Sequence, residues 1–312
     1  MNKVLFGDCR ETLKTIDVKA RMCVTSPPYY GLRDYGGEKN QIGQEDTPEE
    51  FINNLVDVFR SVRDVLTDDG TLWVNIGDSY YNYIPGKGQA LVKQTLSSTE
   101  RDQPQDCPRR GNKLEGLKEK DLIGIPWMLA FALRADGWYL RQDIIWHKPN
   151  PMPESVRDRC TKSHEYLFLL SKNRKYYYDN EAIKEPVKQD WGTRDRSQGK
   201  YHNEGTGLQP HSGLEKSYTK RNKRSVWSIT NKPYKGAHFA VFPPDLIEPC
   251  ILAGSEQGDV VLDPFMGSGT TAMVAKKYNR NYIGCELHED YASLQTDRID
   301  SIPTPLPAII WK

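Results

Sequence analysis

The chain has 312 residues, enough to bury a large core in one sizeable domain or in two modest ones. Its formal net charge is only +1, so a nucleic-acid partner would have to be met by local basic patches rather than by the surface as a whole. The six cysteines are scattered, with neither a Cys-x-x-Cys pair nor a Cys/His cluster, which argues against a zinc site and predicts reduced thiols.

The N-terminal residues lack the apolar stretch of a secretory signal. Nowhere does an uninterrupted apolar run reach the length needed to span a bilayer. We therefore expect a cytoplasmic protein with no membrane partner and no bound metal.

The first quarter of the chain alternates strands and helices. A short strand is predicted over 3–6, a helix over 12–16, and a buried strand over 21–25 that ends at two prolines, which cannot continue a ladder. Thr-Pro-Glu-Glu at 47–50 is typical of a helix start, and apolar residues at helical spacing extend that helix to about residue 66. After a turn at Asp-Gly, another strand is predicted over 71–76.

The same alternation returns in the middle and near the end of the chain. The predicted elements there are a helix over 126–135, strands over 139–146 and 165–171, a helix over 244–252, a strand over 260–263, a helix over 270–277 and a strand over 281–286. Strands alternating with helices predict a doubly wound α/β sheet.

Two polar stretches, 82–120 and 182–236, interrupt this rhythm, and segments of this kind are often solvated loops. The second has twelve basic and five acidic side chains, a net charge of +7. It also carries aromatic residues among those charges, namely Trp191, Tyr201, Tyr218, Trp227 and Tyr234. Because this mixture suits a surface that follows a phosphate backbone, we expect it to bind nucleic acid, with Arg221, Lys223 and Arg224 among the contacts.

A glycine-rich turn follows the predicted strand over 260–263 and reads Asp-Pro-Phe-Met-Gly-Ser-Gly-Thr-Thr over 263–271. Such a turn lets the backbone approach a ligand beneath a helix N-terminus, but it lacks the spacing of a phosphate loop. Glu286 ends the next predicted strand, where an acid can hold ribose hydroxyls. The combination predicts a nucleoside-binding half-fold.

A second motif, Ser26-Pro27-Pro28-Tyr29, follows the predicted strand over 21–25. The exocyclic amine of a base is a poor nucleophile because its lone pair is delocalised into the ring. The Ser26 hydroxyl and the Pro27 carbonyl can accept hydrogen bonds from the amine protons, and proline rigidity holds both acceptors in place. Tyr29 offers a flat face on which an extruded base can stack, although a plain proline turn with surface tyrosines is the alternative.

Together the two motifs resemble the beta class of DNA amino-methyltransferases, the N4-cytosine and N6-adenine family, in which Ser/Asp-Pro-Pro-Tyr comes first and Phe-x-Gly-x-Gly comes late. Gly7-Asp8-Cys9 is similar to the family's segment that contacts the cofactor adenine, and His-Phe-Ala-Val-Phe-Pro over 238–243 is similar to the segment that grips the methionine end. The resemblance covers nearly the whole chain except 82–120.

The resemblance implies a circularly permuted, Rossmann-like S-adenosylmethionine-dependent methyltransferase sheet with an inserted target-recognition region. The implied division of the chain is a base-binding catalytic part (1–81), a polar insertion (82–120), a further catalytic part (121–181), the target-recognition region (182–236) and a cofactor-binding catalytic part (237–312).

Residue by residue, the resemblance implies two groups of site residues. S-adenosylmethionine would be bound by Asp8, Cys9, His238, Phe239, Asp263, Phe265, Gly267, Gly269, Thr270 and Glu286. The catalytic residues that hold the target base would be Ser26, Pro27, Pro28 and Tyr29. The loop over 31–44 is interpreted as a lid over the flipped base, with Arg33 a candidate phosphate contact and a plain surface loop as the alternative for this arginine. Lys148, after the strand over 139–146, is a candidate to contact DNA phosphate or to line the pocket.

The implied activity is site-specific methylation of an exocyclic amine in double-stranded DNA, by base flipping, in a prokaryotic cell or a phage. Serine rather than aspartate at the head of the motif is more typical of N4-cytosine enzymes, and N6-adenine is the alternative. Protein glutamine methylation and an inactive DNA-binding module are further alternatives, but the former places the cofactor motif first and the latter has no need of the retained motif residues. The sequence leaves open the recognition site, a homodimer and a cognate restriction enzyme.

Overall fold

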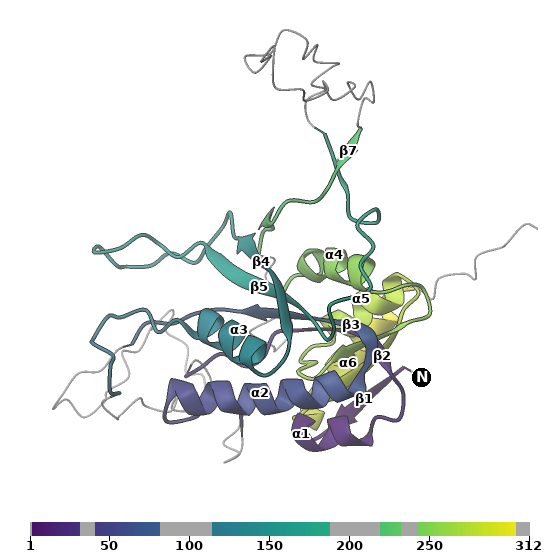
Figure 1. Ribbon diagram of the computed structural model, residues 1–312, viewed down its shortest axis with the longest axis horizontal. Coiled ribbons are helices and arrows are strands. Elements are labelled where there is room, and N and C mark those ends of the chain that lie inside the picture. The colour runs from purple at the N-terminus through teal and green to yellow at the C-terminus, as the bar shows by residue number, and fades with distance from the viewer. Residues whose placement is uncertain (1, 32–40, 82–113, 188–218, 232–241, 304–312) are drawn as a thin grey trace, which may run out of the picture.

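The computed structural model describes residues 2–31, 41–81, 114–187, 219–231 and 242–303 (Figure 1). Its central sheet contains eight strands within those ranges, in the order β1-β10-β9-β2-β3-β5-β4-β8. These strands are β1 (Lys3–Phe6), β2 (Ala20–Thr25), β3 (Leu66–Ile76), β4 (Tyr139–His147), β5 (His164–Ser171), β8 (Val226–Ser228), β9 (Val260–Asp263) and β10 (Asn281–Glu286). Neighbours pair in parallel except that β5 runs antiparallel to both β3 and β4.

Helices cover both faces of this sheet, because side chains that alternate along each strand enter two separate cores. Cys23 and Leu72 belong to the core under α1 (Cys9–Thr12), α2 (Pro48–Val65) and α3 (Ile125–Ala135). Met22 and Trp73, one residue away on the same strands, belong to the core under α4 (Pro244–Gly254) and α5 (Thr270–Lys277) (Figure 1). The last helix within the described residues, α6 (Ala292–Asp300), packs against α5. The predicted doubly wound α/β sheet is confirmed.

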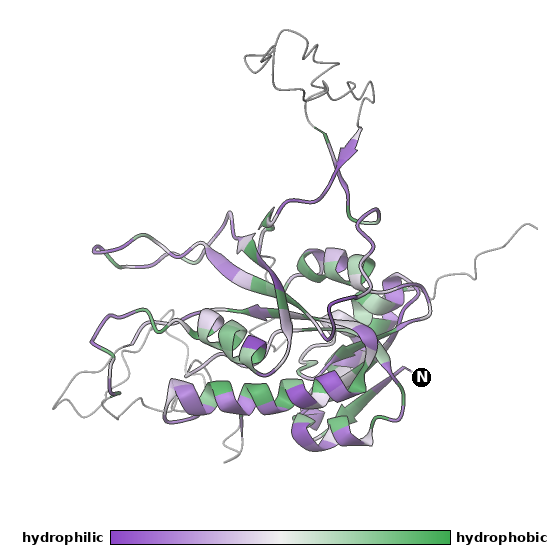
Figure 2. Ribbon diagram, viewed as in Figure 1, coloured by the Kyte–Doolittle hydropathy of each residue, from purple (hydrophilic) through white to green (hydrophobic). Residues whose placement is uncertain are grey.

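The N-terminus of α2 shows why this helix begins where the sequence predicts it. The Thr47 hydroxyl accepts a hydrogen bond from the Glu50 backbone N–H, and the Glu50 carboxylate accepts one from the Thr47 N–H. This reciprocal pair satisfies two N–H groups that the first turn of a helix leaves without partners. Hydrophobic and hydrophilic residues alternate along α2 in Figure 2, and its hydrophobic side lies on the sheet.

Two expected elements differ from the structure. In place of the helix predicted over 12–16, the structure has α1 over Cys9–Thr12 and then a short 3₁₀ helix, η1 (Leu13–Thr15). The helix begins earlier because the Asp8 carboxylate caps its first turn by accepting a hydrogen bond from the Arg10 N–H. The turn predicted at Asp69-Gly70 lies within β3 as an irregularity in its pairing with β2. A Cβ on Gly70 would lie 2.9 Å from the Thr67 carbonyl oxygen, so only glycine fits this bulge.

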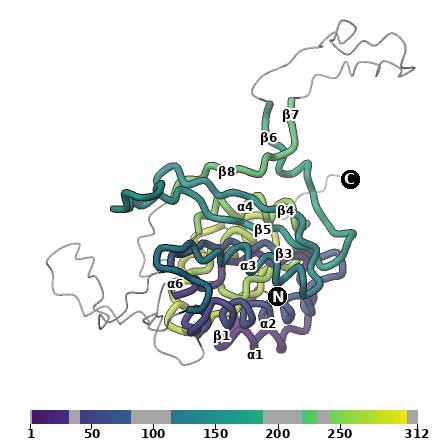
Figure 3. The backbone as a smooth tube through the Cα atoms, turned by 60° about the vertical axis from the view of Figure 1, so that its left-hand side comes forward, coloured from purple at the N-terminus to yellow at the C-terminus, as the bar shows by residue number. Residues whose placement is uncertain are grey.

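The region expected over 182–236 contributes to two different parts of the structure. Strands β6 (Glu185–Pro186) and β7 (Lys220–Arg221) form an antiparallel ribbon that projects away from the sheet (Figures 1 and 3). Strand β8 then returns and pairs with β4 at the edge of the main sheet. Trp227 on β8 is buried, which corrects the expectation that it belongs to an exposed aromatic surface. The other aromatic residues named for that surface, Trp191, Tyr201, Tyr218 and Tyr234, lie outside the described residues.

Two general features of the described residues bear on the sequence expectations. No helix within them combines the length and the apolar character needed to cross a bilayer. Likewise, no group of three or more His, Cys, Asp or Glu side chains in that part of the chain is arranged to hold a metal ion. The cysteines described there are free thiols, and four of them (Cys9, Cys23, Cys250 and Cys285) are buried.

Candidate functional site

The two sequence motifs start from adjacent strands at the same edge of the sheet. Strand β2 pairs in parallel with β9, with Cys23 opposite Leu262, so the carboxyl ends of both strands emerge together. The Thr25 hydroxyl donates a 2.6 Å hydrogen bond to the Asp263 carboxylate. The serine-proline motif therefore begins beside the glycine-rich turn, at the edge where open α/β sheets bind ligands.

Asp263 is the buried anchor of that turn. Its carboxylate also accepts hydrogen bonds from the Thr271 hydroxyl at 2.5 Å and from the Phe265 N–H at 3.0 Å. The side chain is fully buried, and this burial raises the pKa of Asp263 to about 6, against the three hydrogen bonds that favour the charged form. Asp263 thus faces the protein interior and positions the turn from below.

The glycine-rich turn lies over the end of β10 and is held there by backbone contacts. Gly267 and Gly269 have φ values of 52° and 82°, the left-handed region that glycine adopts without a steric penalty. The Met266 N–H donates to the Cys285 carbonyl at 2.9 Å, and a Cβ on Gly284 would lie 2.1 Å from the Met266 Cε. Among the turn residues, Phe265 and Gly267 are partly exposed, whereas Gly269 and Thr270 are buried at the start of α5.

Glu286 closes the other side of the turn. One of its carboxylate oxygens accepts a 2.7 Å hydrogen bond from the Gly267 N–H, and the other accepts a 3.0 Å bond from the His288 N–H. Burial raises the pKa of Glu286 above its ordinary value. Because each carboxylate oxygen has two lone pairs, both oxygens retain capacity for a ligand hydroxyl.

Helix α6 supplies two further side chains to the turn that sequence reasoning missed. The Gln295 amide donates a 2.6 Å hydrogen bond to the Gly267 carbonyl, and the Arg298 guanidinium donates to the Ser268 hydroxyl. Gln295 is only 2% exposed although it is polar. A glutamine on the buried face of a helix must find a hydrogen-bond partner, and this requirement could have singled out Gln295. Nothing in the sequence indicates which carbonyl it contacts.

Asp8 and Cys9 follow β1 and lie at the same edge, because β1 pairs with β10 and the Gly7 N–H donates to the Glu286 carbonyl at 2.8 Å. Burial raises the pKa of Asp8, but the hydrogen bonds and the charge of Arg10 outweigh it and leave that pKa below its ordinary value. Cys9 is buried, which raises the pKa of its thiol. Asp8 is therefore a partly exposed carboxylate, and Cys9 an uncharged wall residue.

On the base-binding side, Tyr29 is fixed by contacts from two strands. Its hydroxyl donates a 2.7 Å hydrogen bond to the Glu165 carboxylate at the start of β5. Its ring lies against Gly77, just after β3, where a Cβ would come within 2.7 Å of the Tyr29 Cε2. In the same motif Ser26, Pro28 and Tyr29 are partly exposed and Pro27 is buried.

Lys148, which follows β4, has two partners beside Tyr29. Its ammonium group forms an ion pair with Glu165 and lies 4.2 Å from the centre of the Trp146 ring. Asp78, the residue after Gly77, accepts hydrogen bonds from the N–H groups of Gly124 and Ile125 and so caps α3. Lys148 therefore lies behind Tyr29 through its ion pair with Glu165, and its contact with DNA phosphate stays a prediction.

The basic residues expected to meet nucleic acid gather near the projecting ribbon. Arg221 and Arg224 both form ion pairs with Glu185 across the β6–β7 ribbon, and the Lys223 ammonium lies 4.9 Å from the centre of the Trp227 ring. The guanidinium groups are partly exposed, so these pairs leave donors available. His238, Phe239 and Arg33, which the sequence also singles out, lie outside the described residues.

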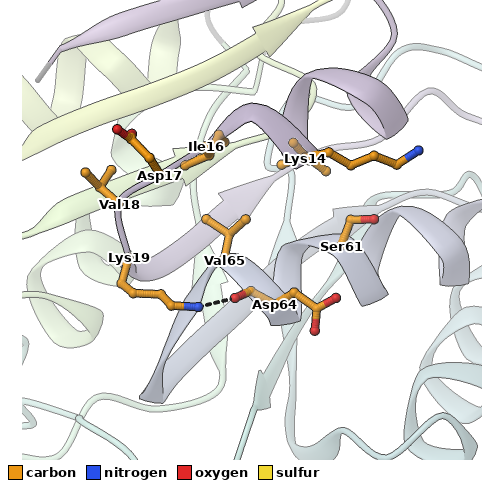
Figure 4. A pocket seen from close by; sticks show the side chains of 9 residues that line it. Lys14, Ile16, Asp17, Val18, Lys19, Ser61, Asp64 and Val65 are labelled. Atoms are coloured by element: carbon orange, nitrogen blue, oxygen red, sulfur yellow. Dashed lines mark hydrogen bonds between the residues drawn. The ribbon is translucent and has the colours of Figure 1, made fainter.

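A surface depression of about 310 Å³ lies at the opposite edge of the sheet (Figure 4). Its walls are the segment from Leu13 to Lys19, which precedes β2, and the end of α2, which precedes β3. The Lys19 ammonium group closes one side by donating to the Asp64 carbonyl. Because this depression flanks the amino ends of the strands, it has no part in the site described above.

Residues 20–297 match the family model for DNA methylases, the N6/N4 methyltransferases. The type II methyltransferase M.SmaI of Serratia marcescens is 49% identical over 298 residues, which cover 95% of this chain and 90% of that protein. M.Cfr9I of Citrobacter freundii, also a type II methyltransferase, is 47% identical over 299 residues, which cover 96% of this chain and 87% of that protein.

Solved structures share the fold. The PvuII DNA methyltransferase, described as cytosine-N4-specific, matches with a TM-score of 0.63 at 18% identity, covering 100% of this chain and 89% of that chain. The complex of M1.HpyAVI with SAM matches with a TM-score of 0.55 at 17% identity, covering 96% of this chain and 100% of that chain. These matches agree with the mixed α/β, Rossmann-like sheet described above.

Proposed function

The chain belongs to the N6/N4 family of DNA methylases, and from this premise we propose that it transfers a methyl group from S-adenosylmethionine to the exocyclic N4 of cytosine at specific sites in duplex DNA. The observation that carries the proposal is the hydrogen bond between Thr25 and Asp263, since it joins the motif that would hold an amine to the turn that would hold the methyl donor.

The residues around the glycine-rich turn fit a nucleoside-type cofactor. A close backbone approach at Gly267 and Gly269, a helix N-terminus behind them and a carboxylate with spare lone pairs at Glu286 are what an adenosyl group needs. We assign direct contacts to Asp8, Cys9, Phe265, Gly267, Gly269, Thr270 and Glu286, propose His238 and Phe239 as further contacts, and give Asp263 a positioning role. When bound there, S-adenosylmethionine supplies a methyl group activated by its positively charged sulfur.

The target base would be extruded from the duplex and held by the serine-proline motif. The Ser26 hydroxyl and the Pro27 carbonyl would accept hydrogen bonds from the two amine protons, which localises the nitrogen lone pair and aims it outward. Tyr29 would stack on the base, with Pro28 fixing the turn between them. No side chain needs to form a covalent bond to the base, because the amine itself is the nucleophile and its surplus proton leaves to solvent.

Cytosine N4 is favoured over adenine N6 by the serine at position 26, where aspartate or asparagine is more typical of adenine enzymes. The structural likeness to a cytosine-N4-specific enzyme supports the same choice. N6-adenine methylation is the second candidate, because both bases present an exocyclic amine to the same acceptors.

DNA would be bound along the basic ribbon, with Arg221, Lys223 and Arg224 facing phosphates, and Arg33 is proposed as a further phosphate contact. The naming of the relatives as type II methyltransferases supports the proposal that a cognate restriction enzyme accompanies the protein. Protein glutamine methylation lacks support, because that class places the cofactor motif first in the chain.

The test is to incubate the protein with unmethylated plasmid DNA and isotope-labelled S-adenosylmethionine, digest the DNA to nucleosides and identify the product by mass. N4-methyldeoxycytidine is expected. N6-methyldeoxyadenosine alone would overturn the choice of base, and a label found in protein but not in DNA would overturn the proposal as a whole. Sequencing the methylated DNA at base resolution would then identify the recognition site.

A further inference from the structure

Glu165 lies beside the serine-proline motif and bonds to side chains from three parts of the chain. Glu165 is the second residue of β5, which runs antiparallel to β3 and β4. The start of β5 therefore lies at the edge of the sheet where β3 and β4 end. One of its oxygens accepts the 2.7 Å bond from the Tyr29 hydroxyl, and the Asn75 amide donates to the same oxygen at 3.3 Å. The other oxygen pairs with the Lys148 ammonium group.

The hydroxyl of Tyr29 has one proton and can therefore donate one strong hydrogen bond. Asn75 Oδ1 lies 3.4 Å from it, too far for a strong hydrogen bond, while Glu165 lies at 2.7 Å. The Asn75 amide is itself held by the Tyr166 carbonyl at 3.1 Å. The bond to the charged acceptor therefore determines the direction of the Tyr29 hydroxyl.

The ring of Tyr29 is constrained at a second point. A Cβ on Gly77 would lie 2.7 Å from the Tyr29 Cε2 and 3.3 Å from its Cδ2, so the ring rests directly on the backbone of Gly77. With its edge on that glycine and its hydroxyl on Glu165, the ring has a fixed plane. A surface on which a base stacks needs only an apolar face, so the tethered hydroxyl serves to orient that face.

The ion pair behind this contact is unlike an exposed surface pair. The side chains of Lys148 and Glu165 are 17% and 15% exposed, and such groups lose hydration that their attraction only partly restores. Stability alone gives little reason to keep the pair. Lys148, which also lies over the Trp146 ring, holds one oxygen of Glu165 and leaves the other turned toward Tyr29.

We propose that Glu165, oriented by Lys148 and Asn75, is a positioning residue for methyl transfer that fixes the plane of Tyr29 before the target base arrives. This inference rests on the proposed function and deepens it. It assigns a role to the antiparallel strand of the sheet, whose first residues lie at the site because that strand runs opposite to its neighbours.

The test compares Glu165→Ala, Glu165→Gln, Tyr29→Phe and the double variant Glu165→Ala/Tyr29→Phe with the wild type. The readout is the single-turnover rate of labelled methyl transfer to unmethylated plasmid DNA, together with the dissociation constant for S-adenosylmethionine. Glu165→Ala and Tyr29→Phe are each expected to lower the rate roughly 10- to 100-fold while leaving cofactor binding unchanged. The double variant should lose no more than either single one, because both remove the same bond.

Glu165→Gln is the conservative rescue, since its amide oxygen can still accept from the Tyr29 hydroxyl, and it should retain most of the rate. Asp143→Asn, an exposed carboxylate on β4, is the matched control and should transfer at the wild-type rate. Glu165→Ala transferring at the wild-type rate, additive losses in the double variant, or a parallel loss of cofactor affinity would each overturn the inference.

If Glu165→Ala does not fold, Tyr29→Phe probes the same bond from the other side with the loss of a single oxygen, and a wild-type rate there would overturn the inference equally. Because the label counts methyl groups on either base, the experiment also works if adenine is the target. A wild-type protein that labels no DNA would overturn the proposed function itself, and this inference with it.

Discussion

The hydroxyl of Thr25 and the carboxylate of Asp263 are joined by a 2.6 Å hydrogen bond although 238 residues separate them in the chain. Thr25 is the last residue of β2 and Asp263 the last of β9, so this bond aligns the two loops that leave those strands. It links the part of the protein that would hold a base to the part that would hold a cofactor.

Replacing Thr25 with valine should therefore weaken both stability and cofactor binding. The valine keeps the shape of threonine but removes a donor from a fully buried carboxylate, which costs about 1–3 kcal/mol. Urea unfolding gives the free energy, and titration with S-adenosylmethionine gives the affinity. Thr296→Ala, which removes an exposed hydroxyl that donates to the Ala292 carbonyl in α6, is the control, and equal losses in both variants would contradict the prediction.

The free energy of unfolding should depend on pH through the protonation of Asp263. Its pKa in the folded protein is about 6, against an ordinary value of 3.8, so the folded state takes up this proton at a higher pH than the unfolded chain does. The contribution of this carboxyl to stability is therefore greatest below the ordinary value, falls as the pH rises toward about 6, and is constant above that.

An Asp263→Asn variant cannot titrate in this window. The difference in unfolding free energy between wild type and variant should move against the wild type between the two pKa values and then level off near about pH 7. Urea unfolding at a series of pH values measures it. A difference that does not change with pH would show that Asp263 titrates normally.

Adding a methyl group at position 284 should displace the glycine-rich turn. The new Cβ of Gly284→Ala would lie 2.1 Å from Met266 Cε and 2.9 Å from its Cγ, which forces the Met266 side chain away from β10. Overpacking of this kind costs about 1–3 kcal/mol, and cofactor affinity should fall because the next residue, Gly267, bonds to Glu286. Shortening the clashing side chain in Gly284→Ala/Met266→Ala should restore affinity, and no restoration would locate the strain elsewhere.

Ser26→Ala should reduce methyl transfer roughly 100-fold while leaving cofactor affinity unchanged, because it removes an acceptor for the target amine and no contact to the glycine-rich turn. Single-turnover transfer and cofactor titration separate the two effects. Ser61→Ala, on α2, removes a hydroxyl remote from the site and should change neither quantity. A matched fall in cofactor affinity for Ser26→Ala would mean that the serine belongs to the cofactor site.

Arg224→Gln should weaken DNA binding through charge alone. The Arg224 side chain is 64% exposed beside the β6–β7 ribbon, so its loss should reduce the slope of log affinity against log salt by about 1, independent of sequence. Fluorescence anisotropy at several salt concentrations measures the slope. Lys14→Gln, an equally exposed cation in an ion pair on η1, is the control, and an equal change there would mean that the effect is not local to the ribbon.

The fold could be predicted well because its signals are local. The capping box at Thr47, the prolines after Thr25 and the glycines after Asp263 each mark a strand or helix boundary within a few residues, and the structure confirms those boundaries. The misplaced helix near Thr12 has the same kind of cause, since the Asp8 cap acts one turn earlier than the apolar spacing indicates.

Candidate site residues could be predicted only where the functional groups lie together in one short motif. Glu165, Gln295 and Asn75 act through partners 28 to 136 residues away, and such partners depend on strand order and register. Glu165 looks like an ordinary strand residue until β5 is known to run antiparallel between β3 and β4. The ion pair of Lys148 could not be predicted for the same reason, because its partner is on the neighbouring strand.

The place of β2 in the sheet also bears on how the protein is made. One of its neighbours, β3, is the next strand along the chain, while the other, β9, is translated only after β3, β4, β5 and β8. Until residues 260–263 have been translated, β2 is an open strand edge with unpaired N–H and carbonyl groups, and a chain cut short before them keeps that edge exposed to aggregation. Premature termination should therefore yield an insoluble fragment rather than a partly working enzyme.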